Sequence, residues 1–248
     1  MAAKTKHIEL DINLHCRIDR NPISEHADPE DFVLTVNGEI YGSPDPTEDI
    51  SKNLQDVLLG KLNFFVIQVG NAVNHHEELA YVCDAYHQTM EAGSAVFDLV
   101  NNGFHPHVQE MFPDACDVDD ILLLDHLTIH PLARGQRLGL AVLRQVIEDW
   151  SKGCSLVVIK PFPLQFEAEA QKSEKWTQLE LGKFSSSEKI AFGKLRNYYQ
   201  RLGFSRIGRT EFYALPTYDP FPTAKQLHIS DSIHVPVEHF PLLPPKKL

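Results

Sequence analysis

Hydrophobic residues in the middle of the chain follow two different periods. Residues 121–129 form a nearly continuous apolar run, which predicts a buried strand that ends before Pro131. Residues 135–150 carry apolar side chains four positions apart, which predicts a helix with one buried face. This stripe consists of Leu138, Val142, Val146 and Trp150. Residues 156–159 then predict a short buried strand.

A second helical period follows a long polar connection at residues 161–184. Residues 185–202 have an apolar stripe, Ser185 and Glu188 fit a capping box at its start, and Gly203 fits a C-cap. The stripe consists of Ala191, Leu195, Tyr198 and Leu202. This segment therefore predicts a second helix.

The first half of the chain has mostly strand patterns. Alternating apolar positions in residues 8–14 and 32–41 indicate strands, and Asn37 with Gly38 could turn the second of these into a hairpin. Residues 62–73 are rich in β-branched and aromatic side chains, which predicts a buried strand.

The remaining segments give weaker patterns. Residues 77–100 predict a helix, or two helices because Gly93 weakens the middle. Residues 204–215 predict a strand or a hairpin. The tail after Pro216 is rich in proline, which predicts a surface segment without regular structure.

Composition places the chain among ordinary soluble globular proteins. Its 248 residues are 43% hydrophobic and 23% charged, with a formal net charge of −11. Lys and Arg do not cluster, which argues against a nucleic-acid partner. No apolar run approaches the ~20 residues that cross a bilayer, and the first residues lack a secretory signal. The four scattered cysteines fit reduced thiols, so we expect a cytoplasmic protein without a membrane partner.

The turn between the central strand and the first helix is the best candidate for chemistry. A helix N-terminus presents unpaired backbone N–H groups and about half a positive charge, which suits a phosphate. Gly135 and Gly139 let a ligand approach this backbone, and Arg134 and Arg137 add charged donors. An ordinary turn whose glycines only permit tight packing fits the same residues.

Two segments resemble the GNAT superfamily of N-acetyltransferases. Residues 127–139 resemble its motif A: Leu127, Ile129 and Pro131 match the strand end, and Arg134 and Gly139 match the loop. Arg137 departs from the pattern, because it replaces the middle glycine of the motif.

The second match lies about sixty residues downstream. Residues 198–204 resemble the Tyr-Tyr-x-x-Leu-Gly-Phe ending of a later helix of that superfamily. Together the two matches cover residues 121–215. The helical pattern before residue 121 departs from the strand meander usual at that place.

The resemblance implies an α/β fold. We expect one mixed, twisted sheet, with a splay between strands 4 and 5 and helices on both faces. Residues 121–215 would form the acetyl-CoA-binding core, residues 1–120 an N-terminal portion or extension, and residues 216–248 a proline-rich tail.

The resemblance also implies acetyl-CoA as cosubstrate, without a metal. The pantetheine would pair with the fourth strand and the pyrophosphate would lie on backbone amides after it. The strand residues are Leu127, Thr128 and Ile129. The amides are those of Arg134, Gly135, Gln136, Arg137, Leu138, Gly139 and Leu140. Arg137 would offer its amide, with its side chain turned outward or onto a phosphate of CoA.

Transfer of an acetyl group to an amine needs two proton transfers. Tyr199 occupies the position of the general acid in the resemblance, although a core aromatic fits the same place. Asp125 is the candidate base because we expect it to share a strand face with Leu127 and Ile129. It could instead pair with an arginine. His126 is expected on the opposite face and is a weaker candidate.

The rival function is a non-catalytic acyl-CoA-binding or regulatory module, which Arg137 at the glycine position suggests. The acceptor amine, a small molecule or a peptide, cannot be named from the sequence, although the negative charge favours a cation. Phe162 or Trp176 is expected to line its pocket. A homodimer remains open. The histidines give no convincing metal site, since His126 and His130 would lie about 13 Å apart on a strand.

Overall fold

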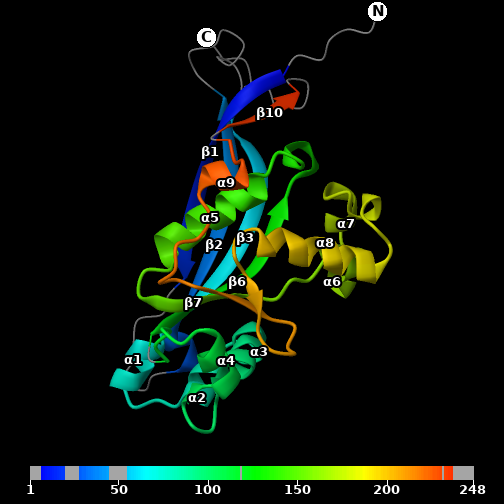
Figure 1. Ribbon diagram of the computed structural model, residues 1–248. Helices are drawn as coiled ribbons and strands as arrows, with labels where there is room; N and C mark the ends of the chain where they lie inside the picture. Colours follow the sequence, from blue (N-terminus) through cyan, green and yellow to red (C-terminus); the bar gives the residue numbers. More distant parts are fainter. Residues whose placement is uncertain (1–6, 20–27, 45–54, 118, 231, 237–248) are drawn as a thin grey trace, which may run out of the picture.

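The computed structural model describes residues 7–19, 28–44, 55–117, 119–230 and 232–236, which form a mixed α/β fold (Figure 1). Its main sheet has eight strands in the order β10-β1-β2-β3-β6-β7-β9-β8. All neighbouring strands are antiparallel except the parallel pair β6 and β7. The strands are β1 (His7–Asp19), β2 (Val33–Pro44), β3 (Val57–Ile67), β6 (Asp120–Ile129), β7 (Cys154–Ile159), β8 (Ser205–Arg206), β9 (Tyr213–Pro216) and β10 (Ser232–Pro236).

The helices and a small ribbon occupy the connections between these strands. The ribbon, β4 (Phe97–Asp98) with β5 (Gly103–Phe104), and four helices lie between β3 and β6. These helices are α1 (Val69–Asn74), α2 (Leu79–Cys83), α3 (His87–Val96) and α4 (Pro106–Met111). The later helices are α5 (Leu138–Trp150), α6 (Ala168–Gln171), α7 (Lys175–Gln178), α8 (Glu188–Gln200) and α9 (Ala224–Leu227).

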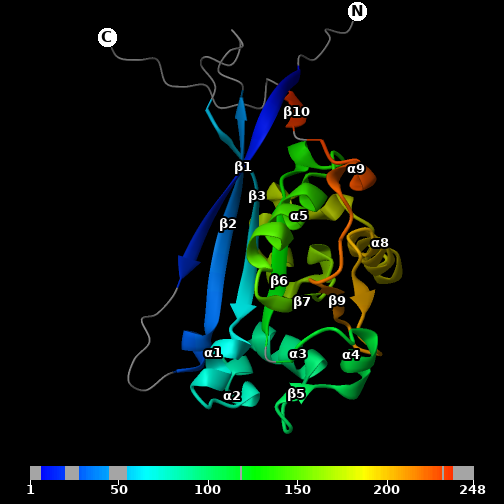
Figure 2. The same cartoon turned by 60° about the vertical axis from the view of Figure 1, so that its left-hand side comes forward.

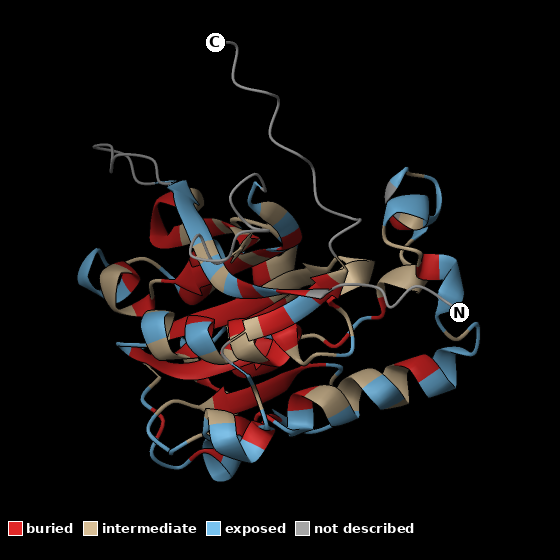
Figure 3. Cartoon of the chain, turned by 90° about the horizontal axis from the view of Figure 1, so that it is seen from above, coloured by how far each residue is buried: buried red, intermediate tan, exposed pale blue. Residues whose placement is uncertain are grey.

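The central strands are buried on both faces. Successive side chains of β6 enter two different cores: Leu122 and Leu124 pack with α5 and α8, whereas Ile121 and Leu123 pack with α1 to α4. Figure 2 shows α1 to α4 gathered at one end of the long strands, and Figure 3 shows the buried sheet between helices. Burial on both faces explains why β6 is a continuous apolar run in sequence.

The strand–helix–strand prediction in the middle of the chain is confirmed, with one shift. The helix α5 begins at Leu138 rather than at Gly135. Gly135 and Arg137 have φ values of +80° and +62°, and this left-handed backbone cannot belong to an α-helix. The turn is therefore longer than predicted, and it presents more backbone to its surroundings.

The second predicted helix and the hairpin after it also form, as α8 and the pair β8–β9. The predicted capping box is wrong. The N-cap residue is Ser187, and the Ser185 hydroxyl accepts a hydrogen bond from the Ser187 amide at 3.2 Å. Glu188 is the first helical residue instead of the third, so it cannot bond back to the cap.

Three predictions in the first half need correction. The strand expected at 62–73 ends at Ile67, and Val69 begins the helix α1. Asn37 and Gly38 form no hairpin, because β2 continues through them with partners on both sides. The segment 77–100 does contain two helices, but they separate around Ala85, and Gly93 packs inside α3.

The proline-rich tail also departs from expectation. Residues 224–227 form α9, and β10 pairs antiparallel with β1, from His7 opposite Pro236 to Asp11 opposite Ser232. Ile233 and Val235 are buried in the core shared with α5. The alternation of buried and exposed residues in β10 covers only five residues. The prolines around it favour irregular structure, so the sequence did not predict this strand. All three portions expected from the sequence thus contribute strands to one sheet.

Pairing between β6 and β7 ends before β6 does. The last parallel partners are Leu124 and Ile159, and beyond them β6 continues for five residues, of which 126–129 pair only with β3 and Asp125 pairs with neither strand. We call residues 125–129 the unpaired edge of β6. A bulge at Asp125 accompanies this change, because Leu124 faces Phe64 while His126 faces the adjacent Asn63.

Candidate functional site

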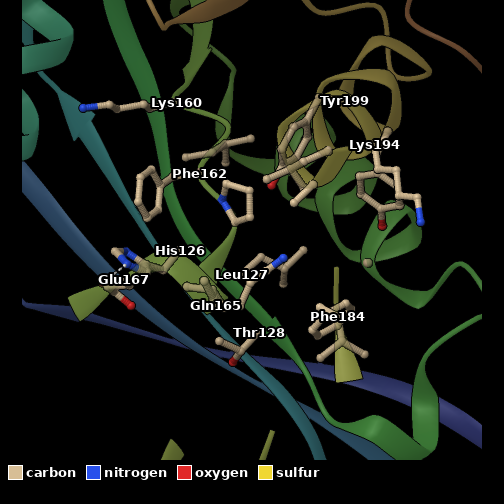
Figure 4. Close-up of a pocket in the computed structure, with 18 of the residues that line it drawn as sticks. His126, Leu127, Thr128, Lys160, Phe162, Gln165, Glu167, Phe184, Lys194 and Tyr199 are labelled. Carbon is tan, nitrogen blue, oxygen red and sulfur yellow. Dashed lines mark hydrogen bonds and ion pairs between the residues drawn. The ribbon is translucent and has the colours of Figure 1, made fainter. Parts of the chain in front are cut away.

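A cavity of about 740 Å³ lies along the unpaired edge of β6 (Figure 4). Its walls come from β6, the turn before α5, the connection after β7, α8 and α3. The lining residues that enter the arguments below are Glu91, Asp125, His126, Leu127, Thr128, Ile129, Arg134, Gly135, Arg137, Leu138, Gly139, Lys160, Phe162, Glu167, Tyr198 and Tyr199. Most residues expected to bind acetyl-CoA therefore border one space. Gln136 and Leu140 do not line it.

The turn before α5 presents unpaired donors. Among the described residues, the backbone N–H groups of residues 135–139 have no hydrogen-bond partner. The flanking amides are occupied, because Arg134 N donates to Pro131 O and Leu140 N to Arg137 O. The amides expected at residues 134 and 140 are thus taken, and five consecutive ones remain. Left-handed residues in such a turn aim successive N–H groups at one point, which suits an anion.

The side chain of Arg134 is not available to an anion in this arrangement, contrary to expectation. Its Nε donates to Ile129 O at 2.9 Å, its Nη2 donates to Leu179 O at 2.7 Å, and the guanidinium lies over the Phe184 ring. Burial lowers the pKa of Arg134. Arg134 therefore fastens the connection after β7 to the end of β6.

Arg137 occupies a backbone position that favours glycine, since its φ is +62°. Its guanidinium donates to the carbonyls of Leu227 and His228, at 3.0 and 3.1 Å. The side chain is thus committed to the C-terminal segment, and Arg137 also borders the cavity. Its amide remains unpaired among the described residues, as the sequence suggested.

Gly139 has a packing role that the sequence did not reveal. A Cβ at this position would collide with the Tyr198 hydroxyl and would lie 3.4 Å from Leu127. Gly135, by contrast, has nothing within 4 Å of such a Cβ, so its backbone conformation and open space are what require glycine. Only Gly135 fits the expectation of free space for a ligand.

Tyr199 lies where α8 approaches β6. Its ring packs in the core near Phe204 and only 9% of the residue is exposed, yet it borders the cavity. Its hydroxyl has no hydrogen-bond partner among the described residues. Burial raises the pKa of Tyr199 to about 12, so the hydroxyl stays protonated at neutral pH and can donate a hydrogen bond. Tyr199 is thus a core aromatic that also borders the cavity, and its role as a general acid stays a prediction.

Asp125 pairs with its neighbour in sequence and not with an arginine. Its Oδ2 lies 2.6 Å from His126 Nδ1, and His126 Nε2 lies 3.3 Å from Glu167 Oε1 (Figure 4). The bulge at Asp125 shifts the alternation by one residue, so Leu124 and Leu127 face the same core. The simple alternation that grouped Asp125 with Leu127 therefore fails here.

His126 carries a positive charge at neutral pH. The hydrogen bond with Asp125, the negative charge of Asp125 and the contact with Glu167 all raise the pKa of His126. Together they outweigh burial, which lowers it, and the pKa reaches about 9. The weaker candidate of the sequence thus becomes the centre of a three-residue cluster. Glu167 was missed because it lies in a polar connection 41 residues away and has no local pattern.

Some polar groups of the strand residues expected beside the pantetheine already have hydrogen-bond partners within the protein. The Thr128 hydroxyl contacts Lys61 N and Lys61 O, both at 3.3 Å, and Ile129 O accepts from Arg134. Leu127 packs against the core and borders the cavity. Phe162 lines this cavity, whereas Trp176 does not line it and lies near Gly182.

Within the described ranges, no group of three or more His, Cys, Asp and Glu side chains is arranged to hold a metal ion. None of the helices described is both long and apolar enough to cross a membrane. Comparison of the chain with protein-family models, with curated proteins and with solved structures gave no match.

Proposed function

We propose that this protein is an N-acyltransferase that moves an acetyl group from acetyl-CoA to an amine. One observation carries the proposal. A single cavity runs along the unpaired edge of β6, and it is bordered by Tyr199 and by four of the five residues whose N–H groups are unpaired, namely Gly135 and residues 137–139. A long thioester with a polyanionic end fits such a space, since the anion and the reacting carbonyl must be held far apart.

The strand order supports a GNAT-like reading of the fold. In this reading β6 and β7 are strands 4 and 5, and the loss of pairing after Leu124 and Ile159 is the splay. The four helices between β3 and β6 would be an addition before motif A, and β10 an addition at the edge. The added helices explain why the segment just before residue 121 departs from the strand meander usual at that place.

The proposal assigns three parts of acetyl-CoA, the pyrophosphate, the pantetheine and the thioester, to the lining of the cavity. The pyrophosphate would accept hydrogen bonds from the amides of residues 135–139 at the positive end of α5. The guanidinium groups of Arg134 and Arg137 bind backbone carbonyls of other segments. These two side chains would therefore help by holding the turn in place and not by contacting the pyrophosphate. The pantetheine would then lie beside residues 125–129, and the thioester would reach Tyr199.

The reaction forms a C–N bond and breaks the C–S bond of the thioester. An ammonium acceptor first loses one proton, which a carboxylate of the cluster, Asp125 or Glu167, would accept and pass to water, because His126 is already protonated. The free amine attacks the thioester, and a second proton leaves the nitrogen as the thiolate gains one. A phenol with a pKa of about 12 is a poor acid for a thiol near 8.5. Tyr199 would therefore act mainly by donating a hydrogen bond to the developing thiolate.

Replacement of the Tyr199 hydroxyl tests this proposal. In Tyr199→Phe we expect thiol release from acetyl-CoA in the presence of amines to fall by about 100-fold. Acetyl-CoA affinity should stay within about twofold, because the ring remains. Tyr218→Phe removes a hydroxyl outside the cavity lining and should leave the rate unchanged.

The rival function predicts a different result. If acetyl-CoA binds but no amine in a broad panel releases thiol, and Tyr199→Phe changes nothing, the protein is a non-catalytic acyl-CoA-binding module. The commitment of Arg137 to the C-terminal segment is compatible with either function, so the kinetic result separates them.

A further inference from the structure

Two ionic clusters lie where β6 and β7 part. Leu124 and Ile159 are the last paired residues of these strands. Asp125 and His126 follow on one strand, and Lys160 follows on the other, so both clusters begin immediately after the last pair. All of these residues except Ile159 border the cavity.

Each cluster contains one cation and two carboxylates. His126 lies between Asp125 and Glu167, at 2.6 and 3.3 Å. Lys160 Nζ lies 3.0 and 3.1 Å from the two carboxylate oxygens of Glu91 and 3.6 Å from Glu211. With both cations protonated, each cluster keeps an excess of one negative charge.

The cavity is therefore polarised. Its other end, around the turn before α5 and along α8, is lined by Arg134, Arg137, Lys194 and Arg201. An anionic group would bind at the end with these cationic side chains. A second, cationic ligand would bind at the end with the two negatively charged clusters. This arrangement opposes a carboxylate at the end near Lys160, since that ammonium already has two carboxylate partners.

Aromatic rings form the apolar wall between the two clusters. Phe162 is 44% exposed and stands edge-on to Phe192 at 5.6 Å between ring centroids. In the view of Figure 4 the Phe162 ring lies between Lys160 and His126. Phe212 also lines the cavity, with Lys160 Nζ 5.6 Å from its centroid. An aromatic or aliphatic body attached to an ammonium would pack here and gain cation–π attraction.

The reacting end of the site is marked independently by Tyr199. Its residue is nine-tenths buried, its hydroxyl has no partner among the described residues, and it borders the cavity. A small adjoining pocket is lined by Tyr199 together with Asp125 and His126. Because Tyr199 borders the cavity, its hydroxyl can donate a hydrogen bond to a polar ligand atom beside it.

We propose that the acceptor is a primary amine bound as a cation, with an aromatic or apolar body and without a carboxylate. Its ammonium binds to Glu167 and Asp125, beside His126, and its body packs on Phe162. This inference rests on the proposed acyltransferase function and specifies the substrate class of the same site. Free amino acids are disfavoured, because their carboxylate would face Glu91, Glu167 and Asp125.

A matched pair of acceptors tests the inference. Phenethylamine and phenylalanine differ only in the carboxylate, and ethylamine lacks the ring. With acetyl-CoA we expect kcat/KM for phenethylamine to exceed that for phenylalanine by about 100-fold, since like charges in an interface cost several kcal/mol. Phenethylamine should also exceed ethylamine by about tenfold, and Phe162→Ala should remove most of that second difference.

Removal of one carboxylate should change the selectivity, and not only the rate. In Glu167→Gln we expect the phenethylamine/phenylalanine ratio to fall by about tenfold, mainly through a higher KM for phenethylamine. Glu174→Gln, an exposed position on the same connection outside the cavity lining, should leave the ratio unchanged. Calorimetric titration of both amines into the protein saturated with CoA should give the same preference, independently of turnover.

The outcomes separate this inference from the proposed function. If thiol is released but phenylalanine equals phenethylamine, or Glu167→Gln leaves the ratio intact, the substrate class is wrong and the acyltransferase stands. If acetyl-CoA does not bind at all, both are wrong. If it binds, and neither turnover nor calorimetry detects phenethylamine, the cationic-amine site is rejected.

Discussion

Gly139 and Tyr198 compete for the same space in the wall of the cavity. A methyl group at residue 139 would overlap the Tyr198 hydroxyl, whose ring is largely buried. We expect Gly139→Ala to lower the free energy of unfolding by about 1–3 kcal/mol, as overpacking does in other cores. Urea denaturation of the variant and the wild type measures this difference.

The same chain provides a control and a rescue. Gly193→Ala in α8 has open space around the new methyl group and should raise the stability by about 0.5–1 kcal/mol. Tyr198→Phe removes the colliding oxygen, so it should recover part of the loss caused by Gly139→Ala. Additive effects of the two substitutions would contradict the steric account.

His126 makes stability depend on pH in a predictable direction. Its pKa rises from 6.5 to about 9 on folding, so the folded state binds the proton more tightly than the unfolded state. The resulting stabilisation is complete below pH 6.5 and disappears as the pH rises through 9. We therefore expect His126→Gln to be more destabilising at pH 6 than at pH 10, measured by denaturation at both values.

Two further variants identify the origin of this effect. Asp125→Asn should remove more of the pH dependence than Glu167→Gln, because the hydrogen bond with Asp125 makes the largest contribution to the raised pKa. An equal loss of stability for His126→Gln at pH 6 and pH 10 would contradict a cationic His126.

The sequence could predict individual residues of the site only where a local motif exists. Tyr199, Gly135 and the strand residues 127–129, which the resemblance singles out, all border the cavity. Glu167 and Lys160 were missed, because their partners lie 41 and 69 residues away along the chain. Arg134 and Arg137 were located correctly, but the carbonyls that they bind belong to distant segments.

At the scale of elements, the turn before α5 is tied to the C-terminal segment. Arg137 binds the carbonyls of Leu227 and His228 after α9, and Gln136 exchanges two hydrogen bonds of 2.8 Å with the backbone of His234 in β10. The same turn that offers amides to an anion therefore also positions the edge strand of the sheet. Neither partner was expected from the sequence.

Two substitutions of Arg137 distinguish the effect of its side-chain hydrogen bonds on stability from the effect of its backbone conformation. Arg137→Ala loses the two hydrogen bonds and keeps the unfavourable φ of +62°, whereas Arg137→Gly loses the bonds but relieves the strain. We expect the glycine variant to be more stable than the alanine variant by about 1 kcal/mol in urea denaturation.

Hydrogen exchange provides a second readout for this tie. In both variants the amides of β10 should exchange faster than in the wild type, while those of the β2–β3 pair should not change. Unchanged exchange in β10 would show that Arg137 does not tie this segment, and equal stability of the two variants would show that its backbone is not strained.

Elements with a long, regular period were predictable, and short ones were not. The strand β6 and the helices α5 and α8 have ten or more residues, so their patterns stand out. The helices α6, α7 and α9 have four residues each, and β10 has five. Such short elements depend on tertiary contacts, because an isolated turn of helix is unstable in water.

At the scale of the molecule, the sheet joins both ends of the described chain. The Ser232 hydroxyl contacts Glu9 across 223 residues of sequence. The pairing of β1 with β10 could not be predicted from the sequence, because local hydrophobic patterns do not show which distant strands pair. Charge is also distributed unevenly: a chain with a net charge of −11 lines one end of its cavity with four cationic side chains.

The central claim is that acetyl-CoA binds in this cavity with its pyrophosphate on the turn before α5. Calorimetric titration of acetyl-CoA tests this claim most directly. We predict saturable binding at one site, with a Kd on the order of 1 μM to 1 mM. Acetylpantetheine, which has the thioester but no pyrophosphate, should bind at least about tenfold more weakly, because it cannot use the amides of residues 135–139. No binding of acetyl-CoA, or equal binding of both compounds, would contradict the assignment of this turn as the pyrophosphate site.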